Sequence, residues 1–231
     1  MMDDLFYKIK NGLIVSCQAE GDDPFNSPEG VTLFARAAKL GGACAIRSEG
    51  IEKTKMIVSE VGLPAIGLIK SKFEDGYVRI TGSFDDVENL IETGANLIAI
   101  DGTFRKRQGW SGPEFIREVK KRYNCLVMAD VATYSEGIAC AEAGADCIST
   151  TLSGYTPETK GNPKQEPDFE LVEKLSSRIK IPVIAEGKIN KTDYAKLMIE
   201  HGAWAVVVGT AITRPRVITS WFVDVIKKES R

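Results

Sequence analysis

The chain has 231 residues, about one and a half average domains, which is also the length of one barrel or one large α/β domain. Hydrophobic residues make up 43% of the chain and charged residues 27%, which excludes a disordered chain, a collagen-like chain and a coiled coil. The 30 basic and 32 acidic residues give a net charge of −2, so no broad basic surface exists for non-specific binding of nucleic acid or anionic membrane.

Short apolar runs rich in β-branched residues recur along the chain and predict parallel strands. Each run is nearly continuous in apolar character, as expected of strands that are covered by helices on both faces. In chain order the runs are residues 13–18, 43–47, 65–70, 97–101, 126–130, 146–150, 183–186 and 203–209.

Amphipathic segments between these runs predict helices. They include residues 28–40, 83–93, 168–178, 190–201 and 215–228. Four helical segments end in glycine just before the next strand, at Gly41-Gly42, Gly94, Gly144 and Gly202. A glycine after the last turn supplies the left-handed helix cap without steric cost.

Eight strand–helix units without a linker predict a single α/β domain over residues 1–231, a closed (β/α)8 barrel with a short N-terminal helix. A doubly wound open sheet is the alternative, but no GxGxxG follows the first strand. Two insertions interrupt the pattern. Residues 71–81 predict a hairpin around Asp75-Gly76, and residues 151–167 form a loop rich in Gly, Pro, Thr and Lys, at the barrel end where function is usually inserted.

Polar residues stand at the ends of the predicted strands, where barrels carry their active sites. The odd strands end in Gln18, Lys70, Asp130 and Glu186, and the even strands end in residues that include Arg47, Asp101 and Thr150-Thr151. Any single one of these is ordinarily a polar residue where a strand meets solvent. The set as a whole favours a site, because side chains from alternate strands form layers across a barrel.

Lys70 and Glu186 each follow directly on an apolar strand. Charges so close to a core are normally paired, and a lysine facing a glutamate in a sheltered pocket suits proton transfer at carbon. A Schiff-base lysine, as in aldolases, is the competing use of Lys70.

The turns after the seventh and eighth strands predict a phosphate site. Gly187-Lys188 and Gly209-Thr210 allow backbone N–H groups to approach an anion, and the helices that follow add a favourable dipole. Arg214 adds a fixed positive charge at the same place. Loops after these two strands commonly bind phosphate in barrels, so we expect a phosphorylated ligand.

Other features have simpler interpretations. His201, the single histidine, stands at a helix C-terminus, and the lack of others excludes a His-rich zinc or iron site. The cluster Arg105-Lys106-Arg107 is interpreted as a solvated loop, with contact to a ligand as the alternative because the cluster follows Asp101 at the active end of the barrel. Five cysteines without a CxxC, an N-terminus without a secretory signal and the absence of a spanning apolar run indicate a cytoplasmic protein that does not enter a membrane.

Several motifs resemble those of the bacterial N-acetylmannosamine-6-phosphate 2-epimerases. The most specific are Ser-Thr-Thr-Leu-Ser-Gly-Tyr-Thr at residues 149–156 and Ala-Ile-Thr-Arg-Pro at residues 211–215. Shorter matches lie at residues 13–19, 45–47, 66–70, 128–130 and 185–189, and the likeness runs from about residue 13 to residue 218. Lys188, where arginine is expected, and Thr210, where glycine is frequent, depart from the family pattern.

The resemblance implies a TIM barrel that epimerises an amino sugar phosphate at C2 in sialic acid and amino sugar breakdown, with no metal or organic cofactor. It places the catalytic lysine on Lys70 and its acidic partner on Glu186. It places the sugar site on Gln18, Arg47, Asp130 and Thr151, and the phosphate site on Gly187, Lys188, Gly209, Thr210 and Arg214. The alternatives are another phosphate-binding barrel enzyme, such as an aldolase, or a non-catalytic sugar-phosphate-binding barrel.

The last helical segment carries apolar residues whose partner the sequence leaves open. Phe222, Val225 and Ile226 could pack on the barrel or on a partner subunit, and we expect a homodimer.

Overall fold

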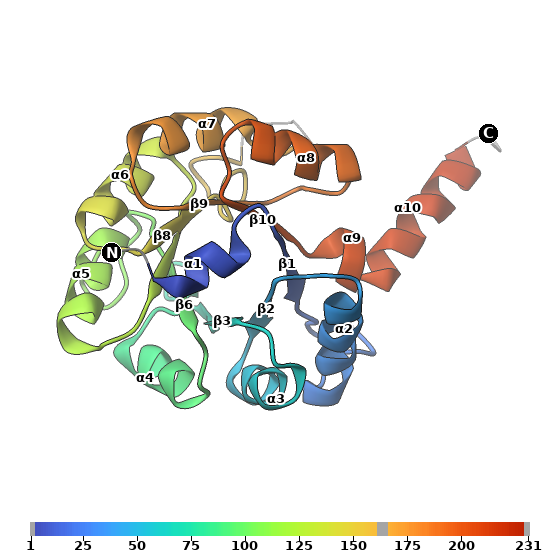
Figure 1. The fold of residues 1–231 in the computed structure, drawn as a ribbon, viewed down its shortest axis with the longest axis horizontal. Coiled ribbons are helices and arrows are strands. Elements are labelled where there is room, and N and C mark those ends of the chain that lie inside the picture. Colours follow the sequence, from blue (N-terminus) through green and yellow to red (C-terminus); the bar gives the residue numbers. More distant parts are fainter. Residues whose placement is uncertain (1–2, 161–165, 229–231) are drawn as a thin grey trace.

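A closed barrel of parallel strands, ringed by helices, forms the body of the computed structural model, which describes residues 3–160 and 166–228 (Figure 1). Around the barrel the order is β1, β10, β9, β8, β7, β6, β3 and β2. Because β1 pairs with both β10 and β2, the sheet has no open edge and the doubly wound alternative is wrong. The strands are β1 (Leu13–Cys17), β2 (Ala45–Glu49), β3 (Ala65–Leu68), β6 (Leu97–Asp101), β7 (Val127–Asp130), β8 (Cys147–Ser149), β9 (Val183–Glu186) and β10 (Ala205–Val208).

The helices lie on the outside of the barrel, and their ends follow the capping signals of the sequence. Ser27, Ser83 and Thr133 accept backbone N–H bonds as N-caps, and the predicted glycine caps have positive φ, for example +80° at Gly94. The helices are α2 (Pro28–Leu40), α3 (Ile51–Val61), α4 (Phe84–Glu92), α5 (Gly112–Arg122), α6 (Tyr134–Glu142), α7 (Phe169–Arg178), α8 (Thr192–Glu200), α9 (Thr210–Thr213) and α10 (Pro215–Lys228).

The predicted short N-terminal helix, α1 (Asp4–Ile9), lies across one end of the barrel (Figure 1). It buries Phe6 and Ile9 against the apolar side chains that fill the barrel interior. The indole Nε1 of Trp204 donates to the Phe6 carbonyl oxygen at 2.6 Å, which ties α1 to the loop before β10. Because α1 closes the end where the strands begin, the open end is the one where they finish.

A small antiparallel hairpin, β4 (Lys70–Lys72) and β5 (Val78–Ile80), follows β3, and it confirms the hairpin expected around Asp75-Gly76. Lys70 belongs to this hairpin, because the barrel strand β3 already ends at Leu68. Arg79 of β5 is buried, forms an ion pair with Asp75 and donates to the Lys106 carbonyl oxygen at 3.3 Å. The hairpin is therefore held against the loop after β6.

The interpretation of residues 105–107 as a solvated cluster is wrong for Arg107. Its side chain is fully buried, and its guanidinium donates to the carboxylate and the carbonyl oxygen of Asp101 at 3.1 and 2.7 Å. Arg105 also contacts the Asp101 carboxylate, at 3.2 Å. The carboxylate at the end of β6 is thus occupied by its own loop, because an unpaired buried charge is strongly unfavourable.

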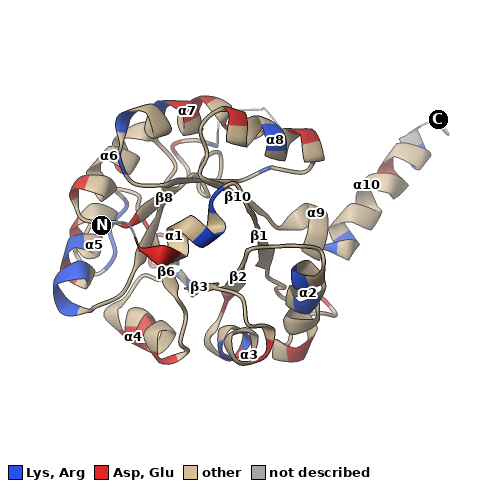
Figure 2. Cartoon of the chain, viewed as in Figure 1, with Lys and Arg blue, Asp and Glu red and all other residues tan. Residues whose placement is uncertain are grey.

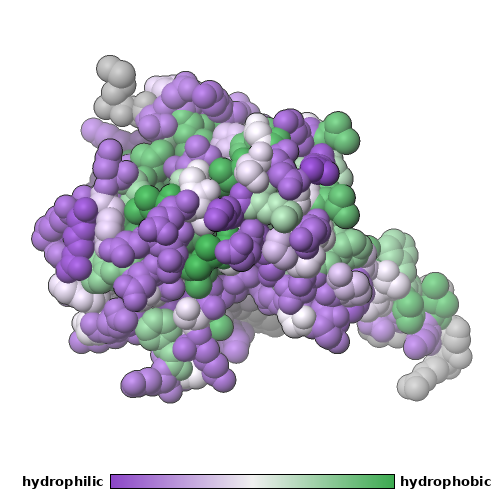
Figure 3. All heavy atoms as spheres, turned by 90° about the horizontal axis from the view of Figure 1, so that it is seen from below, coloured by the Kyte–Doolittle hydropathy of each residue, from purple (hydrophilic) through white to green (hydrophobic). Residues whose placement is uncertain are grey.

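Helix α10 projects away from the barrel, unlike the helices that ring it (Figure 1). Charges of both signs are spread over the outer helices, and α10 carries both signs as well (Figure 2). Phe222 and Val225 are 68% and 59% exposed, so they do not pack on this barrel, and apolar atoms line the projecting helix in Figure 3. No helix in the two described ranges combines the length and the apolar character needed to cross a membrane.

Candidate active site

A cavity of about 560 Å³ opens at the end of the barrel where the strands finish, a size typical of small-molecule sites. Of the residues that the family resemblance assigns to the site, all except Asp130 line it. They are Gln18, Arg47, Lys70, Thr151, Glu186, Gly187, Lys188, Gly209, Thr210 and Arg214. Asp130 lies against this set as the buried partner of Arg47. The predicted residues therefore share one site.

Arg47 of β2 and Asp130 of β7 form a bidentate ion pair across the barrel. The Nη1 and Nη2 atoms of Arg47 donate to the two carboxylate oxygens of Asp130 at 3.0 and 2.5 Å, and both side chains are buried. Burial favours the neutral form of Arg47, but the charges of Asp130 and Glu186 outweigh it and raise the arginine's pKa. The site thus holds a permanent positive charge in fixed orientation.

Glu186 at the end of β9 is the second acid of this cluster. Its Oε2 atom lies 3.2 Å from Nη1 of Arg47, and its side chain is 15% exposed. Desolvation is the largest influence and raises the pKa of Glu186; Arg47 lowers it, and the nearby charge of Asp130 raises it again. The net shift is upward, so Glu186 holds a proton to higher pH than an ordinary glutamate does.

Thr151 links the two acids. Its hydroxyl oxygen lies 2.8 Å from Oδ1 of Asp130 and 2.9 Å from Oε2 of Glu186. A hydroxyl has one proton to donate, so it serves one carboxylate at a time. Ser149 Oγ, 2.8 Å from the same hydroxyl, completes the network. The two acids therefore share one hydrogen-bond donor.

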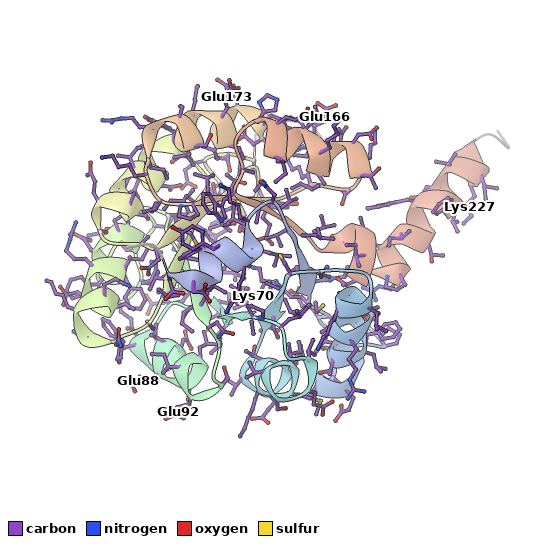
Figure 4. The ribbon with its side chains drawn as sticks, viewed as in Figure 1. Lys70, Glu88, Glu92, Glu166, Glu173 and Lys227 are labelled. Carbon is purple, nitrogen blue, oxygen red and sulfur yellow. The ribbon has the colours of Figure 1, made fainter. Side chains whose placement is uncertain are left out.

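Lys70 lies near the axis of the barrel, whereas the other labelled residues of Figure 4 lie on its outside. Its ammonium group forms an ion pair with Glu20, and its side chain is 32% exposed. Lys70 and Glu186 form no ion pair with each other in the described part of the chain; the charge of Lys70 lowers the pKa of Glu186, but less than Arg47 does. Both groups still line one cavity, so a ligand bound there meets both.

The predicted layer of odd-strand side chains is only partly present. Asp130 and Glu186 meet, but the group that joins them is Arg47, from the second strand of the barrel. The Arg47 side chain starts from an even strand but is long enough to contact both carboxylates. Gln18 turns back on its own strand, where its amide donates to Ser16 Oγ at 2.9 Å.

The turns after β9 and β10, which carry the predicted phosphate residues, also line the cavity. Gly187 and Lys188 both have positive φ, +110° and +57°, which bends the chain sharply after β9. The Lys188 ammonium lies 5.7 Å from the ring centroid of Tyr155. Arg214 ends the short helix α9 and lines the cavity.

The helix contribution to this phosphate site is smaller than expected. Helix α8 starts at Thr192, well after Gly187, and α9 has only four residues. So few peptide units sum to a small dipole. The positive charge at these two turns therefore comes mainly from the side chains of Lys188 and Arg214.

Sequence reasoning missed Glu20, which contacts Lys70 and also Arg214. The signal was available: Glu20 follows Gln18 by two residues in the loop after the first strand. Reading only the final residue of each strand stops short of this position. Active-site residues in barrels also come from the loops that follow the strands.

Comparisons with known proteins identify close relatives of this chain. The family described as "Putative N-acetylmannosamine-6-phosphate epimerase" matches residues 31–228. A protein of Caldanaerobacter subterraneus named "Putative N-acetylmannosamine-6-phosphate 2-epimerase" is 47% identical, over 99% of this chain and 96% of the relative. One of the same name from Clostridioides difficile is 45% identical, over 95% of this chain and 98% of the relative.

Solved structures give the same relationship. The N-acetylmannosamine-6-phosphate 2-epimerase of Clostridium perfringens superposes with a TM-score of 0.90 at 41% identity, covering 97% of both chains. A thiamine phosphate pyrophosphorylase of Pyrococcus furiosus, at 19% identity and a TM-score of 0.62, shares the fold alone. With the expected motifs gathered at one cavity, this chain belongs to the N-acetylmannosamine-6-phosphate epimerase family.

Proposed function

We propose that this chain interconverts N-acetylmannosamine 6-phosphate and N-acetylglucosamine 6-phosphate by removing the proton at C2 and returning one to the opposite face. The observation that carries the proposal is the composition of a single cavity. Lys70, Glu186 and the buried Arg47 line it together with Arg214 and the glycine turns after β9 and β10. Membership of the epimerase family supports the same reaction and its place in amino sugar breakdown.

The reaction needs an open sugar ring before it needs a base. The C2–H bond of the closed ring is not acidic, whereas ring opening creates an aldehyde at C1 next to it. Removal of the proton then leaves an enolate whose negative charge rests on the former aldehyde oxygen. Arg47, held rigid by Asp130, is placed to offset that charge without reorganising.

We assign the proton transfers to Lys70 and Glu186. In one direction the amine of Lys70, after losing to solvent the proton that it carries in the ion pair with Glu20, accepts the C2 proton, and Glu186 delivers its own proton to the other face; in the reverse direction the two exchange roles. Between turnovers in the same direction both groups exchange protons with solvent, which resets them. Glu186 suits this better than Asp130, because its pKa is raised whereas Asp130 is held by both Nη atoms of Arg47.

The phosphate group is assigned to the part of the cavity that is lined by Gly187, Lys188, Gly209, Thr210 and Arg214. Binding energy from this remote group positions the reacting carbon. Lys188 offers a point charge, whereas the guanidinium of Arg214 can bind two phosphate oxygens at once. Gln18, Arg47, Asp130 and Thr151 are assigned to the sugar.

We propose that the reaction uses neither a metal nor an organic cofactor. Within the described ranges, no group of three or more His, Cys, Asp or Glu side chains is arranged to hold a metal ion. The enolate charge is met by Arg47 and Lys70 instead. Activity should survive dialysis against EDTA, and loss of turnover that a divalent ion restores would refute this.

We further propose a homodimer that forms through α10. Trp221, Phe222, Val223 and Val225 are all exposed on this projecting helix, and large exposed apolar patches mark interaction sites. A second copy is the partner that is always present at equal concentration. Analytical ultracentrifugation should show a dimer that Phe222→Glu converts to a monomer; a monomeric wild type refutes the proposal.

We place the protein in the cytoplasm. Its five cysteines are free thiols, and a reducing compartment preserves that state. Burial raises the pKa of Cys17 to about 12, so this thiol behaves as a small core residue and is protected from reaction.

The deciding experiment incubates the purified protein with N-acetylmannosamine 6-phosphate in deuterated water and follows it by proton NMR. We expect N-acetylglucosamine 6-phosphate that carries deuterium at C2. Cleavage of the sugar, with a borohydride-trapped adduct on Lys70, would favour the aldolase. Binding without turnover or exchange would favour a non-catalytic barrel.

A further inference from the structure

One carboxylate oxygen contacts two cations that line the cavity. The Oε1 atom of Glu20 contacts the Lys70 ammonium and lies 3.6 Å from Nη2 of Arg214. Lys70 opens the hairpin after β3 and Arg214 follows β10, so these cations come from distant parts of the chain. Glu20, in the loop after β1, is the contact that they share.

The loop that carries Glu20 is held in place from helix α3. The Lys53 ammonium donates to the carbonyl oxygen of Ala19 at 3.0 Å and to the side-chain oxygen of Asn26 at 2.7 Å. These bonds hold the Ala19 carbonyl, directly before Glu20, and the Asn26 side chain, six residues after it, whereas the Glu20 side chain is 47% exposed.

Glu20 is ionised in this arrangement. Partial burial raises its pKa, but the hydrogen bond and charge of Lys70, followed by the charge of Arg214, lower it by more. An exposed ion pair of this kind contributes little to folding stability. The Glu20 charge therefore acts mainly on the binding of a ligand at Lys70 and Arg214.

A phosphate dianion on Arg214 would approach the same carboxylate. Like charges a few ångströms apart repel, and Arg214 cannot serve both partners fully. When phosphate binds Arg214, Glu20 loses attraction to Arg214 and keeps its contact with Lys70. Phosphate binding and the placement of Lys70 are thus linked through one side chain.

We propose that Glu20 is a positioning residue that couples phosphate binding to Lys70. Glu20 contacts both cations and opposes anion binding; with phosphate on Arg214 it holds Lys70 alone, near C2. The coupling rests on the proposed reaction. The competition between Glu20 and phosphate for Arg214 rests only on the proposed phosphate site.

The first test measures binding of inorganic phosphate by isothermal titration calorimetry. Glu20→Gln should bind phosphate roughly three- to tenfold more tightly than wild type, because it lacks the repelling charge. Asp22→Asn is the matched control: it makes the same charge change in the same loop, where Asp22 contacts Arg216 and neither Lys70 nor Arg214. It should stay within about twofold of wild type.

Glu20→Asp keeps the charge and should keep wild-type affinity for phosphate. Damage to the fold weakens binding, so tighter binding by Glu20→Gln cannot come from misfolding. Equal or weaker phosphate binding in Glu20→Gln, equal tightening in Asp22→Asn, or no binding to any of these proteins would each overturn the proposal.

The second test uses turnover of the phosphorylated sugar. Glu20→Gln should lower KM and, since Lys70 is no longer held, also lower kcat by about tenfold to a hundredfold. An unchanged kcat overturns the coupling even if phosphate binds more tightly. If wild type turns over no sugar, the proposed function fails, and the phosphate titration still decides whether Glu20 opposes anion binding.

Discussion

Both Nη atoms of Arg47 face the carboxylate of Asp130, and the same Nη1 atom faces Glu186 at 3.2 Å. The two bonds to Asp130 fix the plane of the guanidinium, and the contact with Glu186 places its charge beside the acid that lines the cavity. One arginine thus serves as a structural and an electrostatic centre, and its Nε atom has no hydrogen-bond partner in the described structure. A group held this tightly has few ways to adapt when a partner is lost.

Replacing Arg47 with methionine should destabilise the fold strongly. The variant leaves Asp130 charged and buried without its partner, which costs about 3–5 kcal/mol of unfolding free energy. Urea denaturation measures the loss. Arg36→Met is the control, because Arg36 pairs with Glu60 on the surface and should cost no more than about 1 kcal/mol. Equal losses in the two variants would contradict this account.

Glu186→Gln should stabilise the protein at neutral and higher pH. The folded state raises the pKa of Glu186, so it favours the protonated carboxyl over the ionised one. That preference contributes stability below the ordinary glutamate pKa, and the contribution is lost as pH rises through the folded value. Glutamine resembles the protonated form at every pH and does not suffer this loss.

The measurement is the melting temperature of both proteins from pH 4 to pH 8. Wild type and Glu186→Gln should melt together at the acidic end, and the variant should melt increasingly above wild type as pH rises. Glu92→Gln, an exposed substitution on the outside of α4, provides the baseline (Figure 4). A gap that is constant with pH, or one of opposite sign, would show that Glu186 is not held in its protonated form.

The barrel was predictable because its signals are local. Continuous apolar runs identified the strands, and glycines such as Gly94 and Gly202 marked the helix ends by their need for positive φ. Most predicted cavity residues lie close to the carboxyl ends of the barrel strands or in the loops that follow them, although Arg47 lies within β2, two residues before its end. Each of these inferences needs only neighbouring residues and the known direction of parallel strands.

Side-chain pairing was less predictable, because it depends on reach and on loops. Arg47 joins Asp130 and Glu186 across the barrel, and Lys70 pairs with Glu20 from a loop fixed by Lys53. Nothing in the strand pattern specifies which charge a long side chain reaches. The direction of α10 could not be predicted for a related reason: its apolar residues are equally consistent with packing on the barrel and with packing on a partner.

Lys70→Met should abolish epimerisation and deuterium exchange at C2 while the fold stays intact. The side chain is partly exposed and its ion pair with Glu20 adds little stability, so the loss is one of chemistry. Lys72→Met, two residues along the same strand, is the control and should keep full activity. Circular dichroism must stay native in both; substantial turnover in Lys70→Met would remove Lys70 from the mechanism.

Arg214→Ala should raise KM for the phosphorylated sugar about tenfold to a hundredfold, the effect of losing one charge-assisted hydrogen bond. Its effect on unphosphorylated N-acetylmannosamine, a far poorer substrate, should be small. The neighbouring Arg216→Ala removes an exposed arginine that contacts Asp22 and should leave both substrates unaffected. Similar efficiency of the two sugars with wild-type protein would mean that the phosphate site is misassigned.

Thr151→Val should slow turnover and shift its dependence on pH. The Thr151 hydrogen bond lowers the pKa of Glu186, so losing the hydroxyl should raise that pKa further. If Glu186 delivers the proton, activity declines on the alkaline side as Glu186 ionises, and the midpoint of this decline should move to higher pH in the variant. Thr151→Ser retains the hydroxyl and should restore both the rate and the midpoint. The profiles of kcat against pH for the three proteins decide the matter: a slower Thr151→Val with an unmoved midpoint would show that Thr151 contributes through packing alone, and that another group sets the alkaline limb.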